Sequence, residues 1–137
     1  MKYAVRFYSK TGNTKLLADA VAQVLGCDAL PVSESLNENT ELLFLGSSVY
    51  AGQYDKAVGA FLEENKSKIG TIVCFGSSAS GKTTAGKISA WAEKNGVKVC
   101  DKVFTCPGHF LFMHKERPDS RDLEAVAAFV KDIAAGV

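Results

Sequence analysis

The sequence lacks the features that mark membrane, secreted and nucleic-acid-binding proteins. Its sixteen Lys and Arg residues almost balance fifteen Asp and Glu, and the formal net charge of +1 is spread without blocks of one sign. No apolar run approaches the ~20 residues that a membrane-spanning helix requires. The start of the chain has no signal-peptide hydrophobic region. We therefore expect a cytoplasmic protein with neither a nucleic-acid nor a membrane partner.

The sequence also has no closely spaced pair of cysteines. The four cysteines occur singly, without a CxxC motif. Cys74 and Cys100 lie in apolar, strand-like stretches, where a free thiol behaves as a small hydrophobe, so we expect both to be buried. A zinc site would need more closely spaced ligands, and we expect no bound metal.

What the chain does contain is a regular alternation of apolar strands and amphipathic helices. The strands are expected at 2–8, 29–32, 41–46, 71–76 and 97–105, and the helices from 14 to 25 and near 54–66, 83–95 and 119–135. Helices between successive strands favour right-handed crossovers and a parallel sheet covered on both faces. With no linker or repeat dividing the chain, we predict one α/β domain over residues 1–137, a three-layer, doubly wound sheet of five parallel strands.

In such a sheet, ligands bind beyond the carboxyl ends of the strands, where the loops at 9–14, 47–53 and 76–82 are expected. The first loop, Ser9-Lys10-Thr11-Gly12-Asn13-Thr14, places hydroxyls, an amide and a glycine between a strand and a helix. The glycine lets the backbone curl around a ligand, and the helix terminus offers N–H donors to an anion such as a phosphate monoester. Alternatively these residues only cap the helix, although capping needs one of them.

This segment closely resembles the Ser/Thr-x-Thr-Gly-Asn-Thr phosphate loop of flavodoxins, which also follows their first strand. The resemblance implies the sheet order 2-1-3-4-5 of the short-chain, flavodoxin-like fold. It implies a bound FMN whose phosphate lies on residues 9–14. It further implies electron transfer with redox partner proteins of the reductase or ferredoxin type. Because the cofactor carries the chemistry, we expect no catalytic acid or nucleophile from the chain.

A second stretch, Ser47-Ser48-Val49-Tyr50-Ala51-Gly52, resembles the first flavin loop of the same family. The resemblance implies that Tyr50 stacks on the isoalloxazine ring, which suits a flat apolar side chain with a polar tip. It also implies that the Ala51 carbonyl turns to accept a hydrogen bond from the reduced flavin. Gly52 would make that turn easy.

The third loop admits two functions. Gly76-Ser77-Ser78-Ala79-Ser80-Gly81-Lys82-Thr83 matches the P-loop pattern G-x-x-x-x-G-K-[ST], in which Lys82 would meet phosphates and Thr83 a magnesium ion. No apolar strand ends in the aspartate that an NTPase needs, and Asp101 is expected in mid-strand. By the flavodoxin resemblance the same segment is the second flavin loop, with backbone donors facing the ring from Gly76, Ser77, Ser78, Ser80 and Gly81.

Two departures from the flavodoxin pattern keep a further function open. The third loop has no aromatic residue to cover the second face of the flavin, and the chain is nearly neutral, whereas electron-shuttling flavodoxins are typically strongly acidic. Both features suit an FMN-dependent reductase of a small-molecule acceptor such as a quinone. We predict an FMN electron carrier, with this reductase and the NTPase as alternatives.

Overall fold

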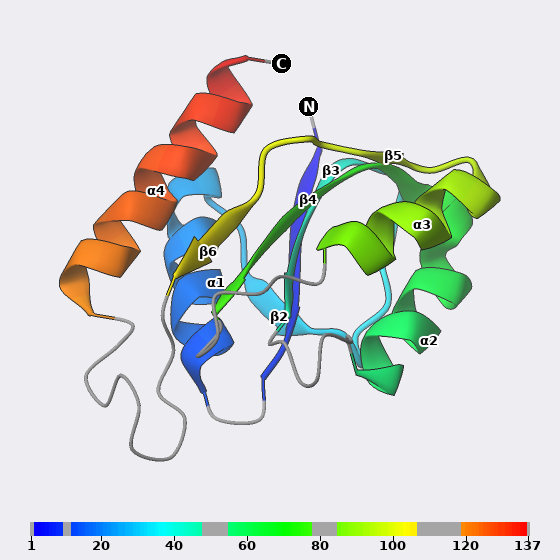
Figure 1. The fold of residues 1–137 in the computed structure, drawn as a ribbon, viewed down its shortest axis with the longest axis horizontal. Coiled ribbons are helices and arrows are strands. Elements are labelled where there is room, and N and C mark those ends of the chain that lie inside the picture. The colour runs from blue at the N-terminus through cyan, green and yellow to red at the C-terminus, as the bar shows by residue number, and fades with distance from the viewer. Residues whose placement is uncertain (1, 10–11, 48–54, 78–84, 107–118, 137) are drawn as a thin grey trace.

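A parallel β-sheet forms the middle layer of the molecule (Figure 1). The computed structural model describes residues 2–9, 12–47, 55–77, 85–106 and 119–136. The strand order is β2-β1-β3-β4-β5, with β6 also paired to β4, and every pairing is parallel, which confirms the predicted order 2-1-3-4-5. The strands are β1 (Tyr3–Tyr8), β2 (Ala29–Pro31), β3 (Thr40–Ser47), β4 (Ile69–Ser77), β5 (Lys98–Val99) and β6 (Phe104–Cys106).

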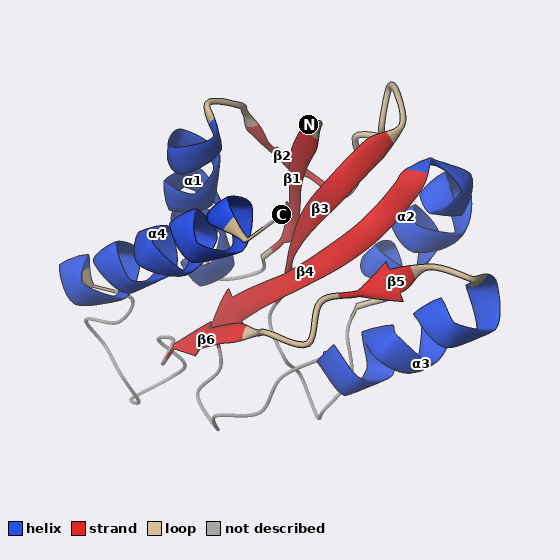
Figure 2. Ribbon diagram, turned by 90° about the horizontal axis from the view of Figure 1, so that it is seen from above, coloured by secondary structure: helices blue, strands red, loops and turns tan. Residues whose placement is uncertain are grey.

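Helices cover both faces of the sheet, which gives the three layers that the sequence predicts (Figure 2). The described α-helices are α1 (Asn13–Leu25), α2 (Lys56–Asn65), α3 (Ala85–Asn95) and α4 (Ser120–Ala135), and a short 3₁₀ helix, η1 (Lys66–Lys68), follows α2. Helices α1 and α4 pack on one face, and α2 and α3 pack on the other. Within these parts of the chain, no helix combines the length and apolar character needed to cross a membrane.

The central strands supply both apolar cores because their side chains alternate between the two faces. In β3, Leu42 and Phe44 enter the core under α1 and α4, whereas Leu43 and Leu45 enter the core under α2 and α3. Burying one such side chain stabilises the fold by about 1.5–3 kcal/mol. A strand buried on both faces needs apolar residues at nearly every position, as the sequence of β3 shows.

The expected fifth strand is divided in two. Val99 of β5 pairs with Ile72 of β4, and Phe104 of β6 pairs with Phe75. Between these two pairs the chain advances five residues on the outer strand (99 to 104) but only three on β4 (72 to 75). The two extra residues interrupt the hydrogen-bonded ladder, as a β-bulge does. Asp101 lies in this interruption and is exposed, so the expectation that it is in mid-strand was wrong.

No helix lies between β2 and β3; the chain crosses by turns that buried polar side chains hold in place. The guanidinium of Arg6 in β1 donates to the carbonyl oxygens of Glu34, at 2.9 Å, and Ser35, at 3.1 Å. The amide oxygen of Asn65, at the end of α2, accepts a hydrogen bond of 2.9 Å from the Leu36 backbone N–H. This β2–β3 connection is thereby tied to both the sheet and α2.

Candidate functional site

The carboxyl ends of β1, β3, β4 and β6 lie at one edge of the sheet. In register, Tyr8 pairs with Ser47, and Gly76 of β4 pairs with Thr105 of β6. The loops after these parallel strands therefore start from neighbouring points, as a doubly wound sheet requires of a ligand site. The described members of the predicted site at this edge are Ser9, Gly12, Asn13, Thr14, Ser47, Gly76 and Ser77.

The remaining predicted cofactor-binding residues lie outside the described residues. They belong to all three loops, and the flavin-stacking and peptide-turn roles implied by the resemblance fall among them. They are Lys10, Thr11, Ser48, Val49, Tyr50, Ala51, Gly52, Ser78, Ser80 and Gly81. Their roles stay predictions.

The first loop turns back on itself before α1 begins. The Gly12 backbone N–H donates to the hydroxyl oxygen of Ser9 at 2.9 Å. Gly12 is the N-cap of α1. Its φ of +88° lies in the left-handed region, which glycine adopts without the strain that a residue with a Cβ would have. As a glycine, this N-cap residue has no side chain with which to accept a capping hydrogen bond.

The start of α1 differs in charge from the starts of α2 and α4. Asp55 caps α2 by accepting from the Ala57 backbone N–H, and Asp119 caps α4 in a capping box with Asp122. In contrast, α1 has a glycine N-cap and no acidic residue in its first turn. Since a carboxylate at a helix N-terminus offsets the positive end of the helix dipole, α1 keeps that positive potential at the edge of the sheet. An anion is favoured there.

Two glycines bring backbone and helix close together beneath this edge. A Cβ built on Gly46 would lie 2.5 Å from the ring of Phe75 and 2.9 Å from Cγ2 of Thr14, whose side chain is fully buried. A Cβ on Gly76 would overlap the carbonyl oxygen of Ser47. The first turn of α1 is thus seated on the end of β3 at Gly46, and Gly76 lets β4 lie close to the backbone of Ser47. A larger residue would displace Thr14 or Phe75 at the first glycine and the end of β3 at the second.

Solved structures share this arrangement over the whole chain. A flavodoxin from the domain Archaea matches with a TM-score of 0.81 at 21% identity, covering 99% of this chain and 98% of that one. Oxidised flavodoxin 1 from Bacillus cereus matches with a TM-score of 0.75 at 18% identity, covering 100% and 99%. The chain has a flavodoxin-like fold.

The same flavodoxin-like fold also matches a part of a longer enzyme. The rubredoxin:oxygen oxidoreductase of Desulfovibrio gigas gives a TM-score of 0.74 at 15% identity, covering 98% of this chain but 35% of that one. No protein-family model matches the sequence, and no curated protein does. The likeness is therefore one of three-dimensional structure.

Burial makes two thiols of this flavodoxin-like fold poor nucleophiles. Cys74 is buried as predicted, and its burial raises its pKa to about 12. Burial, followed by the charge of Asp28, also raises the pKa of Cys27. Cys100 follows the end of β5 and is partly exposed, so its predicted burial was wrong, whereas Cys106 is buried. Across the described residues, no cluster of His, Cys, Asp and Glu could hold a metal ion.

The position of Asp101 also bears on the P-loop alternative. Asp101 follows β5, whose partners in β4 are Thr71 and Ile72, well before the carboxyl end of β4 at Ser77. An aspartate at that height does not reach the edge at which a P-loop after β4 would begin. Lys82, which the alternative needs, lies outside the described residues.

The burial of a charged residue in β1 was missed at the level of sequence. Arg6 is only 6% exposed, and its guanidinium donates to the carbonyl oxygens of Val5, Glu34 and Ser35. Burial lowers its pKa, while the nearby Glu34 raises it. A charged residue flanked by apolar ones in a central strand was the available signal, because such a residue needs several hydrogen-bond partners.

Proposed function

We propose that the chain binds FMN at the carboxyl edge of its sheet and transfers electrons through it. The observation that carries the proposal is the amino terminus of α1: the helix directly follows the β1 loop, its N-cap is Gly12, and its first turn has no acidic residue. Backbone N–H groups and hydroxyls in this arrangement suit a phosphate dianion. The flavodoxins with which the chain shares its fold support a flavin as the bearer of that phosphate.

In this proposal the chain binds and orients, and the cofactor carries the redox chemistry. Residues 9–14 hold the phosphate, with Lys10 adding a positive charge and the α1 terminus adding N–H donors. Residues 47–52 and 76–81 hold the ring, with Tyr50 stacking on it. Bound FMN would supply one- or two-electron transfer. A redox protein of the reductase or ferredoxin type would donate or accept the electrons.

The test compares FMN with riboflavin, which has the same ring system and no phosphate. Each flavin is titrated into the apo chain, and the quenching of flavin fluorescence gives Kd. We expect FMN to bind at least about tenfold more tightly, a difference of ~1.4 kcal/mol that the phosphate site must supply. Equal affinities would contradict the proposal.

A matched pair of variants separates this site from the P-loop alternative. Ser9→Ala removes the hydroxyl that accepts from Gly12 and should weaken FMN binding. Lys82→Ala should leave FMN affinity unchanged. If instead the chain binds ATP and Lys82→Ala abolishes that binding, the NTPase alternative is correct.

An FMN-dependent reductase of small molecules is the second candidate. A net charge of +1 provides little long-range attraction toward a basic protein partner, which favours a small-molecule acceptor such as a quinone. Steady-state oxidation of NAD(P)H in the presence of a quinone would support the reductase. Rapid electron exchange with a ferredoxin-type donor, without that turnover, would support the carrier.

A further inference from the structure

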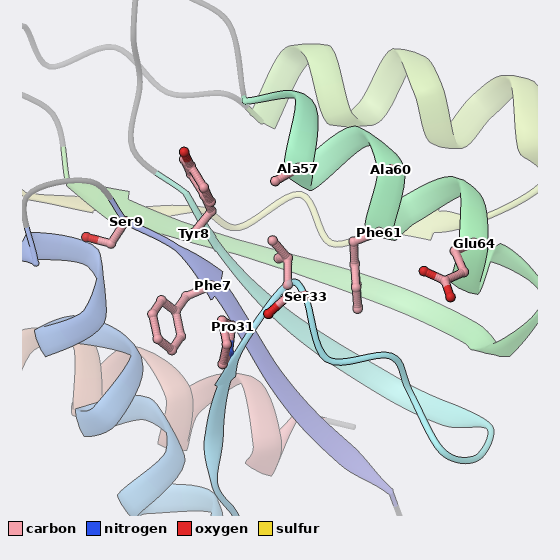
Figure 3. Close-up of a pocket in the computed structure, with 10 residues that line it drawn as sticks. Phe7, Tyr8, Ser9, Pro31, Ser33, Ala57, Ala60, Phe61 and Glu64 are labelled. Carbon is pink, nitrogen blue, oxygen red and sulfur yellow. The ribbon is translucent and has the colours of Figure 1, made fainter.

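A pocket of about 430 Å³ lies between α2, the end of β1 and the β2–β3 connection (Figure 3). Tyr8, the last residue of β1, and Ser9, which follows it, line the pocket on one side, and Ser33 lines it from the connection. In Figure 3, Ser9 and Glu64 mark opposite ends of the pocket. It therefore adjoins the first loop at one end and extends away from that loop along α2.

The pocket exists because of two features of the fold. On its α2 side it is lined by residues 57, 60, 61 and 64, the i, i+3, i+4, i+7 pattern of one helix face. Ala57 and Ala60 are too small to fill the space, and Phe61, only 1% exposed, forms an apolar base. On the other side, β2 is followed by turns, so on that side no helix covers α2.

The pocket lining is mostly apolar, with one acidic residue at one end. Glu64 is the charged member among the described residues that line the pocket, and no Lys or Arg joins it. One carboxylate oxygen of Glu64 accepts a hydrogen bond of 3.0 Å from the Ser35 hydroxyl, which leaves further acceptor positions on the carboxylate. Arg6 is committed to backbone carbonyls and does not line the pocket.

We propose that this pocket binds a small aromatic molecule that carries a protonated amine or amidine. The ring lies among Tyr8, Phe61 and the two alanines, and the cation meets the carboxylate of Glu64. Aromatic faces and a carboxylate both attract a cation, and the same set repels an anion. The volume is at the low end of the range for ligand pockets, about 300–1,000 Å³, so one or two rings fit. The inference does not depend on FMN binding.

The test uses benzamidine and benzoate, which share a ring and carry opposite charges. Each is titrated into the ¹⁵N-labelled full chain, and backbone amide shifts are followed by NMR. We expect benzamidine to shift the amides of Ser33, Ala57 and Ala60 in a saturable manner, and benzoate to have no such effect. Equal binding of the two probes, shifts at other residues, or no shift with benzamidine would overturn the proposal.

A matched pair of glutamates on α2 tests the charge. Glu64→Gln should weaken benzamidine binding about tenfold or more, because the amidinium loses its ionic partner. Glu63→Gln, one residue away, should leave it unchanged, because Glu63 instead accepts from the Trp91 indole. Ala60→Phe should fill the pocket and abolish binding. Equal losses in the two glutamine variants would overturn the proposal even if Ala60→Phe fails to fold.

Discussion

The methyl group of Thr14 lies where only a glycine at position 46 leaves room for it, because a Cβ on Gly46 would come within 2.9 Å of Cγ2 of Thr14. The same Cβ would lie 2.5 Å from the Phe75 ring, so the space above β3 is filled from two sides. This contact fixes the height of the first turn of α1 above the sheet, and with it the position of the candidate phosphate site.

Gly46→Ala should therefore destabilise the fold by about 1–3 kcal/mol, the usual cost of adding a methyl group to a packed core. Urea unfolding followed by circular dichroism measures it. The control is Gly86→Ala on the exposed side of α3, where a Cβ meets nothing within 4 Å. That variant should be unchanged or stabilised by up to about 1 kcal/mol. Equal stabilities of the two variants would contradict the packing argument.

Asn13→Asp places a negative charge in the first turn of α1. With no flavin present it should stabilise the chain by about 0.3–1 kcal/mol, because the charge meets the positive end of the helix dipole. It should weaken FMN binding about tenfold or more by repelling the phosphate, and leave riboflavin binding unchanged.

The control for that charge is Ser120→Asp, at the matching first position of α4, which Asp119 and Asp122 already supply with negative charge. It should alter neither flavin affinity. If Asn13→Asp weakens riboflavin and FMN equally, the effect comes from distortion of the site and not from the phosphate.

Alkylation should distinguish the cysteines. In native protein at pH 8, iodoacetamide should modify the partly exposed Cys100 first and Cys27 more slowly, because burial raises the pKa of Cys27. Cys74, with a pKa of about 12, and the buried Cys106 should react only on unfolding. Peptide mass spectrometry after timed quenching measures the order. Early modification of Cys74 would show that β4 opens in the native state.

The Glu63 carboxylate should titrate below its ordinary value of 4.5. The hydrogen bond from the Trp91 indole, at 2.6 Å, lowers its pKa most; burial opposes this effect, and Lys66 lowers the pKa further. Because the folded-state pKa is lowered, the stabilisation is present above the unfolded pKa and is lost as the pH falls through the folded one. Carbon-13 NMR of the carboxyl group should show a higher pKa in Trp91→Phe, and no change would contradict this assignment.

The apolar strands were predictable because β3 and β4 are buried on both faces and need uninterrupted hydrophobic sequence. The end of α1 was equally clear: the helix was expected to end at residue 25, and the next residue, Gly26, adopts a φ of +71° as its C-cap. The division of the fifth strand was not predictable, since Lys98 to Thr105 contains strand-forming residues on both sides of Asp101. Register against β4 decides where the ladder breaks, and register is a tertiary property.

The edge at which the candidate site lies followed from strand–helix alternation, and the first loop followed from its composition. The absence of an acidic cap on α1, relative to Asp55 and Asp119 at the other helices, became visible only when the N-cap residues were located. The pocket beside α2 escaped sequence analysis because Ala57 and Ala60 are ordinary helix formers. Their small size matters only where no neighbouring helix fills the space.

The interruption between β5 and β6 affects how copies of this protein behave toward each other. A long, straight outer strand would offer a row of backbone donors and acceptors on which a strand from another molecule could assemble. Here the outer edge of the sheet consists of β5, with two residues, and β6, with three. Exposed Asp101 and Lys102 lie between them. Such a border gives an incoming strand too little length to continue the sheet, which protects a nearly neutral protein against edge-to-edge aggregation.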